Sequence, residues 1–391
     1  MPFFPDRATL EQYAERARAR LLQFAPGRRM LTARPLRGLL LNTEQLEERV
    51  RALASEHRVV QSDGSMLLLQ RTIDRNERLV NNAYRAFNGD ARARLSITPA
   101  AEWLVDNIHV VTDQIREVRQ DLPQGYYRKL PKLASGPYRG FPRIYGLALT
   151  IIEHTDGHLD QEQLVRCVVA YQAVAPLTMG EVWAVPIMLR LGLIDNIGRL
   201  ANLTLDAREL RVEADAWAER VLAERSTTSG EGHPILREIE QKYPQLLLPF
   251  VVQLLRRLRG HEGEVDVAAL VAWIERQPAL PYNTAEELIH AENQRQAANQ
   301  VSVANTITSM RMLNAIDWET WFERVCLVEQ VLRQDPNGTY ARGTFATRDR
   351  YRHELEVLAR GSGMSELDLA RLVIEHAQQA RREERAEAEG H

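Results

Sequence analysis

Residues 104–118 read LVDNIHVVTDQIREV, and their apolar spacing decides the fold. Leu104, Ile108, Val111, Ile115 and Val118 succeed one another in steps of four, three, four and three residues. This spacing places them on one face of an α-helix, with the charged residues on the other faces. Because alternating strand-like patterns are scarce, the sequence predicts an all-α fold. We expect a multi-helix bundle, arranged as one elongated bundle or as two adjoining helical subdomains. The same helical spacing recurs at 164–174, 250–258 and 327–332.

Residues that favour helix starts precede several of the apolar segments. Thr98 before Pro99 suits an N-cap followed by a proline in the first turn. Thr284 precedes an acidic first turn, and Ser365 with Glu366 precedes the last apolar helix. These signals support the helical interpretation independently of the apolar spacing.

Irregular stretches indicate how the chain divides. Residues 121–145 contain four prolines and form an irregular basic and aromatic loop, and residues 226–232 form a polar Ser/Thr/Gly linker. The sequence therefore predicts an N-terminal helical subdomain at 1–225 and a C-terminal one at 233–391. Residues 59–69 fit either a weak β-hairpin or a helix–turn–helix corner.

The composition excludes several classes of protein. Of the 391 residues, 45% are hydrophobic and 26% are charged, which excludes a disordered or fibrous chain. The net charge of −3 gives no global attraction for nucleic acid. The longest apolar run, 246–252, is far shorter than the roughly 20 residues of a membrane span. No secretory signal is evident, so a cytoplasmic location is expected, with Cys167 and Cys326 reduced and buried.

The loop at 121–145 contains the candidate ligand-binding residues. Its basic residues alternate with aromatic ones, and such a set can bind an anion, a carbohydrate or a lipid headgroup. The alternative is a structured loop in which tyrosine hydroxyls and arginines hold helix ends together. The candidates are Tyr126, Tyr127, Arg128, Lys129, Lys132, Arg139 and Arg143.

Two other polar clusters have structural interpretations that compete with chemical ones. The segment 154–160 contains two histidines and two aspartates at metal-ligand spacing, but Asp160 also suits a helix N-cap. Glu181 could be a buried catalytic carboxylate, although Thr178 three residues earlier makes a capping box with it. We therefore predict no catalytic residue, no metal ligand and no cofactor.

Long strings of the sequence resemble a known bacterial family. They include EWLVDNIH at 102–109, REVRQDLPQGYYRKLPKL at 116–133, PLTMGEVWA at 176–184 and SVANTITS at 302–309. A further block runs through 328–352. These strings resemble the N-terminal region of cyclic β-1,2-glucan synthases, and the resemblance extends over residues 45–380.

The resemblance implies a role in glucan synthesis. The family uses UDP-glucose to polymerise a β-1,2-glucan on the protein itself and then cyclises it. No catalytic motif of that family is found here, so the expectation is a non-catalytic scaffold or interaction module. Its partners would be the glycosyltransferase and membrane modules at the inner face of the inner membrane, with β-1,2-glucan or UDP-glucose as ligand. Alternatives are a free-standing carbohydrate-active enzyme, or a glucan- or nucleotide-binding module centred on 121–145.

Overall fold

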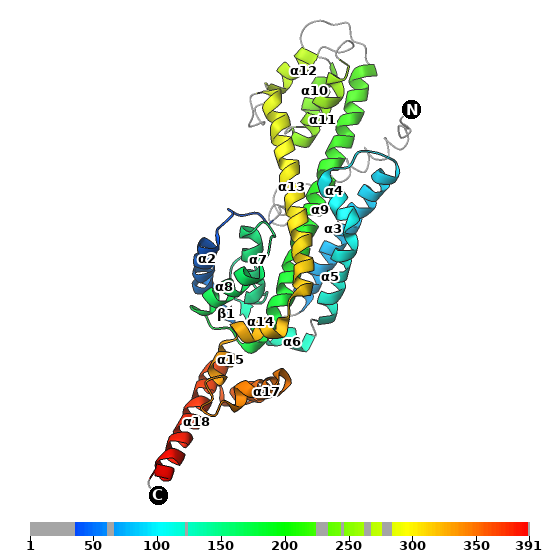
Figure 1. The fold of residues 1–391 in the computed structure, drawn as a ribbon. Helices are drawn as coiled ribbons and strands as arrows, with labels where there is room; N and C mark the ends of the chain where they lie inside the picture. The colour runs from blue at the N-terminus through cyan, green and yellow to red at the C-terminus, as the bar shows by residue number, and fades with distance from the viewer. Residues whose placement is uncertain are drawn as a thin grey trace. The chain divides into compact units, whose positions relative to one another are not determined.

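The structure, a computed structural model, is helical in most of the part that it describes. The described residues are 36–60, 66–121, 124–223, 234–243, 246–261, 267–275 and 284–389. They contain seventeen helices and two strands of two residues each, so the predicted all-α fold is confirmed (Figure 1). The predicted linker at 226–232 lies outside the described residues, and the division at that point stays a prediction.

The described helices range from four to 45 residues in length. No helix in this described part combines the length and the apolar character that crossing a bilayer requires. In chain order the elements are α2 (Thr43–Glu56), β1 (Val59–Val60), α3 (Leu67–Arg92), α4 (Pro99–Asp106), α5 (Ile108–Asp121), α6 (Gln124–Lys129), β2 (Lys132–Leu133), α7 (Arg143–His154), α8 (Gln161–Gln172), α9 (Met179–Ala223), α10 (Pro234–Lys242), α11 (Leu248–Arg259), α12 (Val267–Glu275), α13 (Ala285–Ala315), α14 (Trp318–Val325), α15 (Leu327–Leu332), α16 (Thr339–Arg342), α17 (Phe345–Ser362) and α18 (Glu366–Glu389).

The described residues form two compact units, each built from separated stretches of sequence. Unit 1 comprises residues 78–108 and 197–304, and unit 2 comprises residues 36–77, 109–196 and 305–389. The long helices α3, α9 and α13 each supply residues to both units. Neither unit is therefore a continuous segment of the chain.

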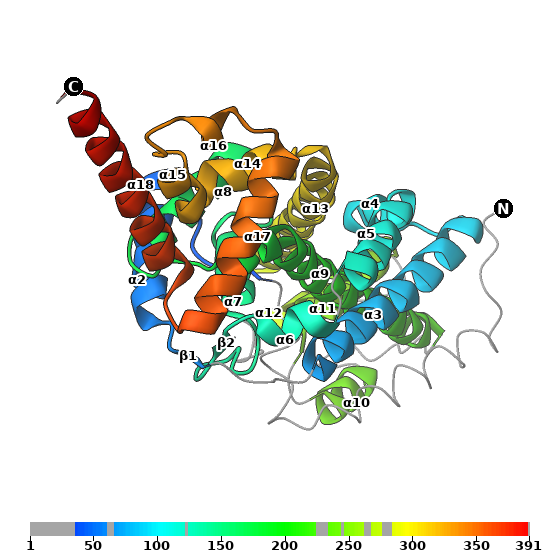
Figure 2. The ribbon, with the colours of Figure 1, turned by 90° about the horizontal axis from the view of Figure 1, so that it is seen from below.

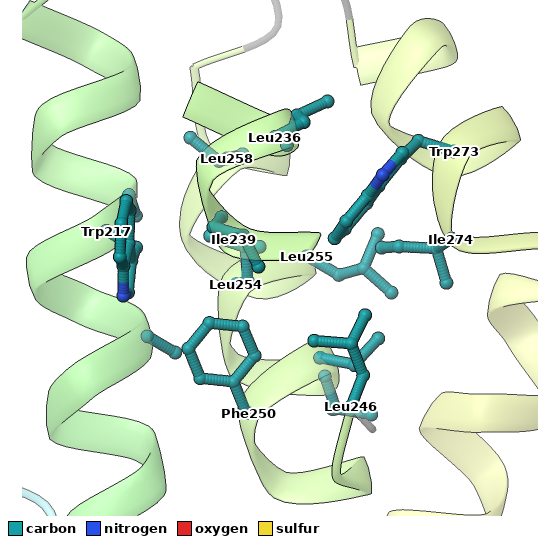
Figure 3. Close-up of a cluster of buried hydrophobic side chains, with 14 of the residues drawn as sticks. Trp217, Leu236, Ile239, Leu246, Phe250, Leu254, Leu255, Leu258, Trp273 and Ile274 are labelled. Atoms are coloured by element: carbon teal, nitrogen blue, oxygen red, sulfur yellow. The ribbon is translucent and has the colours of Figure 1, made fainter. Parts of the chain in front are cut away.

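Unit 1 has its own apolar core. The last turns of α9 pack with α10, α11, α12 and the first part of α13 around a cluster of buried side chains (Figure 3). Phe250, Leu254 and Leu255 of α11 lie in this cluster with Trp217 of α9 and Trp273 of α12. The apolar spacing at 250–258 therefore predicted the buried face of α11 correctly.

Unit 2 is organised around α7, in which every residue from 143 to 152 is buried. Helix α2 packs against both α7 and α8, and α14 also contacts α8. Helix α18 packs against α15 and α17 (Figure 2). The short sheet joins distant parts of this unit, since Val59 of β1 pairs antiparallel with Leu133 of β2.

Two local features differ from the simplest interpretation of the sequence. The stripe at 104–118 belongs to two helices, because Asn107 ends α4 before α5 begins. The Asn107 side chain donates a hydrogen bond to the Trp103 carbonyl oxygen, 2.8 Å away, and such bonds compete with helix continuation. The strand at 59–60 pairs with 132–133 and not with a neighbouring segment, so it is not one arm of a local hairpin.

Most of the predicted helix caps are confirmed. Thr284 and Ser365 accept hydrogen bonds from backbone N–H groups three residues later, at 3.2 and 3.1 Å. Thr98 does occupy the N-cap of α4, but its side chain makes no capping bond. Both cysteines are free and buried, and burial raises the pKa of Cys167 and of Cys326 to about 12.

Candidate functional site

A cleft of about 620 Å³ lies within unit 2. Its walls come from α6, the first turns of α9, α14, α17 and the start of α18. The backbone N–H of Met179 donates to Glu366 Oε2 at 2.7 Å, which joins the start of α9 to the start of α18. Segments far apart in the sequence therefore meet at one concave surface.

An aromatic stack forms one side of the cleft. The ring of Trp183 lies nearly parallel to that of Phe322, with the centroids 4.3 Å apart and an interplanar angle of 13°. Phe345 meets the edge of Trp183 at a centroid distance of 6.3 Å. Phe322 is fully buried, whereas Trp183 is partly exposed. The cleft thus has an indole ring held in a fixed orientation by the two phenylalanines.

Charges of both signs line the same cleft. Three basic residues, Lys129, Arg352 and Arg360, face three acidic ones, which are Asp349, Glu356 and Glu366. Arg360 Nη2 lies 2.5 Å from Glu356 Oε1, and Arg352 Nη2 lies 3.1 Å from Asp349 Oδ1. Burial raises the pKa of Glu366, and the neighbouring carboxylate of Glu356 adds to this, while the hydrogen bond from Met179 opposes it.

A buried ionic network fixes Arg352 at the cleft wall. Its Nη1 donates to Glu329 Oε2 at 2.7 Å, and the same carboxylate accepts bonds from Arg333 and the Tyr340 hydroxyl. Burial is the largest single effect on the pKa of Arg352 and lowers it, but the hydrogen bonds to Glu329 and Asp349 and the electrostatic effects of Glu329 and Tyr340 together raise it above its ordinary value. The guanidinium also lies over the ring of Phe322, 5.1 Å from the centroid. Arg352 is therefore a charged part of the wall that is held by several contacts.

A second buried ion pair holds the start of α7 to the start of α9. Arg143 Nε and Nη2 donate to the two carboxylate oxygens of Glu181 at 2.5 and 2.6 Å. Thr178 and Glu181 complete the predicted capping box, with bonds of 3.0 and 3.2 Å in the two directions. The structural interpretation of Glu181 is thereby confirmed. Its partner Arg143 was a ligand candidate in the sequence.

The seven candidate ligand residues do not form one surface. Tyr126 and Lys129 line the cleft, whereas the side chains of Arg128 and Arg139 are exposed and are not among its lining residues. The remaining three, Tyr127, Lys132 and Arg143, are buried in unit 2, and the side chains of Lys132 and Arg143 are hydrogen-bonded there. Ligand binding by any of the seven stays a prediction.

Lys132 is the most unusual of the buried candidates. Its Nζ donates to the carbonyl oxygens of Tyr127 and Leu130 at 2.5 and 2.6 Å, and lies 4.2 Å from the centroid of the Tyr127 ring. Burial lowers the pKa of Lys132 to about 8, against an opposing effect of Glu181. Burial also raises the pKa of Tyr127 to about 12. These contacts fix the chain between α6 and β2.

The sequence allowed two interpretations of the polar segment 154–160, a helix cap or a metal site, and the contacts in the structure are those of a cap and a turn. Asp160 caps α8 through the N–H of Gln163 at 2.9 Å, and His154 Nδ1 lies 2.8 Å from the Leu39 carbonyl oxygen. Asp156 pairs with Arg37 at 3.3 Å. Within the described ranges, no group of three or more His, Cys, Asp or Glu residues is arranged to hold a metal ion.

The sequence did not reveal the aromatic stack of the cleft or its acidic lining residues as parts of a site. Trp183 lies five residues after Thr178, in a segment whose pattern predicted the start of an apolar helix. Phe322, Asp349 and Glu356 come from α14 and α17. Helical spacing does not show which distant segments meet.

The fold and the cleft define a helical protein with a mixed-charge, aromatic-walled cavity of the size that accepts a small ligand. No family model matches the chain. Over 307 residues, which are 78% of this chain, it is 36% identical to cyclic beta-(1,2)-glucan synthase NdvB of Rhizobium meliloti (strain 1021). The resemblance expected from the sequence is therefore confirmed. The chain spans about a tenth of the length of that relative, since the match covers 10% of it.

Proposed function

We propose that this chain is a non-catalytic helical module of a β-1,2-glucan synthase, which supports the part of the enzyme that transfers glucose. The observation that carries the proposal is the 36% identity over 78% of the chain to a protein named as a cyclic β-(1,2)-glucan synthase. The module would lie at the inner face of the bacterial inner membrane, beside the glycosyltransferase and membrane modules of the synthase. UDP-glucose would be the sugar donor of those modules.

The non-catalytic role is also supported by how the prominent buried charges are used. Glu181 and Glu329, which burial could make into catalytic acids, are both held by arginines and by further hydrogen bonds. These two residues therefore fit a structural role.

A replacement experiment tests the proposal. In Rhizobium meliloti, the matching region of NdvB is exchanged for residues 45–380 of this chain, and the cyclic glucan in cell extracts is measured. We expect glucan production to be retained, and to be lost when the region is deleted. Unchanged glucan production after deletion would contradict a supporting role. Glucose transfer from UDP-glucose by this chain alone would contradict the non-catalytic role.

A carbohydrate-active enzyme is the second candidate, because three carboxylates line the cleft and the pKa of Glu366 is raised. A hydrolase of this kind needs one protonated and one ionised carboxyl beside the glycosidic bond. Incubation of the chain with linear β-1,2-gluco-oligosaccharides distinguishes the two candidates. Release of new reducing ends, abolished in Glu366→Gln, would favour the hydrolase, whereas unchanged oligosaccharides are expected for the module.

A further inference from the structure

We propose that the cleft of unit 2 is an oligosaccharide-binding site, in which a neutral sugar chain lies against the Trp183–Phe322 stack. The saccharide class is argued from the cleft alone. The choice of a β-1,2-linked glucan as its particular ligand rests on the proposed function.

The size and construction of the cleft fit a ligand of a few sugar rings. Its volume of about 620 Å³ lies within the roughly 300–1,000 Å³ of small-molecule sites. All of its lining residues belong to unit 2, so the cleft is complete within that unit. Its walls are held by the Arg352–Glu329 bond of 2.7 Å and by the Met179–Glu366 bond of 2.7 Å. A site whose walls are already ordered loses little entropy when a ligand binds.

The aromatic stack supplies the apolar contact that a sugar ring requires. One face of a glucose ring consists mainly of C–H groups, and such a face packs on an indole. Trp183 is partly exposed and keeps its orientation because Phe322 lies parallel to it at 4.3 Å and Phe345 meets its edge. The indole is therefore ready to accept a ring without rearrangement.

The charges around the stack favour a neutral ligand over a nucleotide. Three cations and three anions line the cleft, and two arginines are already paired with Glu356 and Asp349. A diphosphate would meet three carboxylates and would gain little from arginines whose charges are already balanced by carboxylates. Hydroxyl groups, by contrast, both donate to carboxylates and accept from guanidinium and ammonium groups. A polyhydroxylated ligand can therefore use cleft residues of both signs.

The chain offers two matched pairs of substitutions for the test. Trp183→Ala removes the indole from the cleft, and Trp318→Ala removes another partly exposed indole of unit 2 that does not line it. Lys129→Ala and Arg128→Ala remove neighbouring exposed cations of α6, of which only Lys129 lines the cleft. Because Lys129 is exposed, its replacement leaves the fold intact even if Trp183→Ala disturbs packing.

The test is isothermal titration of the full 391-residue chain with linear β-1,2-gluco-oligosaccharides, cello-oligosaccharides and UDP-glucose. We expect saturable binding of the β-1,2-linked oligosaccharides, weakened about tenfold or more by Trp183→Ala and about threefold by Lys129→Ala. Trp318→Ala and Arg128→Ala should bind as the unchanged chain does.

Three outcomes would overturn the site: no heat with either oligosaccharide at millimolar concentration, binding that Trp183→Ala and Lys129→Ala leave unchanged, or UDP-glucose binding more tightly than the oligosaccharides. Trp183-dependent binding of cello-oligosaccharides alone would support the saccharide site and contradict the assignment to β-1,2-glucan. The result of the NdvB replacement does not depend on any of these titrations, so failure of the site and failure of the proposed function can be told apart.

Discussion

Two arginine–glutamate pairs of unit 2 have the same closest N···O distance and different surroundings. The closest N···O distance is 2.5 Å both in Arg143–Glu181 and in Arg360–Glu356. The side chains of the first pair are 9% and 1% exposed, and those of the second are 51% and 29% exposed. The first pair lies at the joint of α7 and α9, and the second lies at the wall of the cleft.

The difference shows that burial, and not residue type, decides what a charged pair does. A buried pair with backbone partners is needed for the stability of the fold. If one member is lost, the charge of the other stays buried with neither a partner nor solvent to stabilise it. An exposed pair contributes little to stability but keeps oxygens and N–H groups within reach of a ligand. The segment 121–145, which the structure forms into α6, β2 and the start of α7, divides in the same way, since Arg143 is buried while Lys129 lines the cleft.

Replacement of Glu181 by alanine should have the largest effect. It leaves the Arg143 guanidinium buried without a carboxylate and removes the capping bond to the Thr178 N–H. We expect a loss of about 3–5 kcal/mol in the free energy of unfolding. Urea unfolding followed by far-UV circular dichroism measures it, as a transition shifted to lower urea.

The double substitution Arg143→Met with Glu181→Leu is the control for this prediction. It removes both charges and fills the space with apolar side chains, so most of the lost stability should return. If the double variant were as unstable as Glu181→Ala, packing or capping rather than the unpaired charge would be the cause.

The second prediction concerns His57, which lies next to the buried pair. Burial lowers the pKa of His57 to about 4, with Arg143 adding to the effect, while the ordinary value is 6.5. Its Nδ1 lies 2.8 Å from the Tyr171 hydroxyl oxygen. At a pH between these two pKa values, the His57 imidazole is protonated in the unfolded chain and neutral in the folded one. The contribution of His57 to the free energy of unfolding is therefore fully present above pH 6.5 and is lost as the pH falls towards 4.

Unfolding in urea at a series of pH values between 4 and 7 checks this. The chain should lose more stability on acidification than the variant His57→Gln, in which the titrating group is gone. Equal losses in the two proteins would show that the imidazole of His57 does not resist protonation in the folded state.

Replacement of Glu356 by alanine should have the smallest effect on stability. Its pair with Arg360 is partly exposed, and such pairs contribute about 0.2–1 kcal/mol. We expect a change in unfolding free energy below about 1 kcal/mol, together with weaker binding of the oligosaccharide in the titration described above. A loss as large as that of Glu181→Ala would mean that the cleft wall, too, is part of the structural core.

The helices of this protein could be predicted because their signals are local. Leu164, Cys167 and Val168 follow one another at helical spacing and are all buried in α8. The break at Asn107 could not be predicted in this way, since the apolar spacing continues across it without change.

The cleft could not be predicted because its parts come from separate segments. Composition singled out the segment 121–145, and two of its residues, Tyr126 and Lys129, line the cleft. The sequence does not show that Arg143 meets a carboxylate 38 residues away, nor that Trp183 meets Phe322. Only the packing of α9 against α7 and α14 brings these groups together.

The indole ¹⁵N–¹H spectrum of the full chain tests the central claim most directly, because the protein has only six tryptophans. On titration with linear β-1,2-gluco-oligosaccharide, the account predicts that the Trp183 signal shifts progressively to saturation. The signals of Trp217 and Trp273, in the core of unit 1, should stay in place. A saturable shift of Trp217 or Trp273 with Trp183 unmoved, or no shift of any indole, would contradict the account.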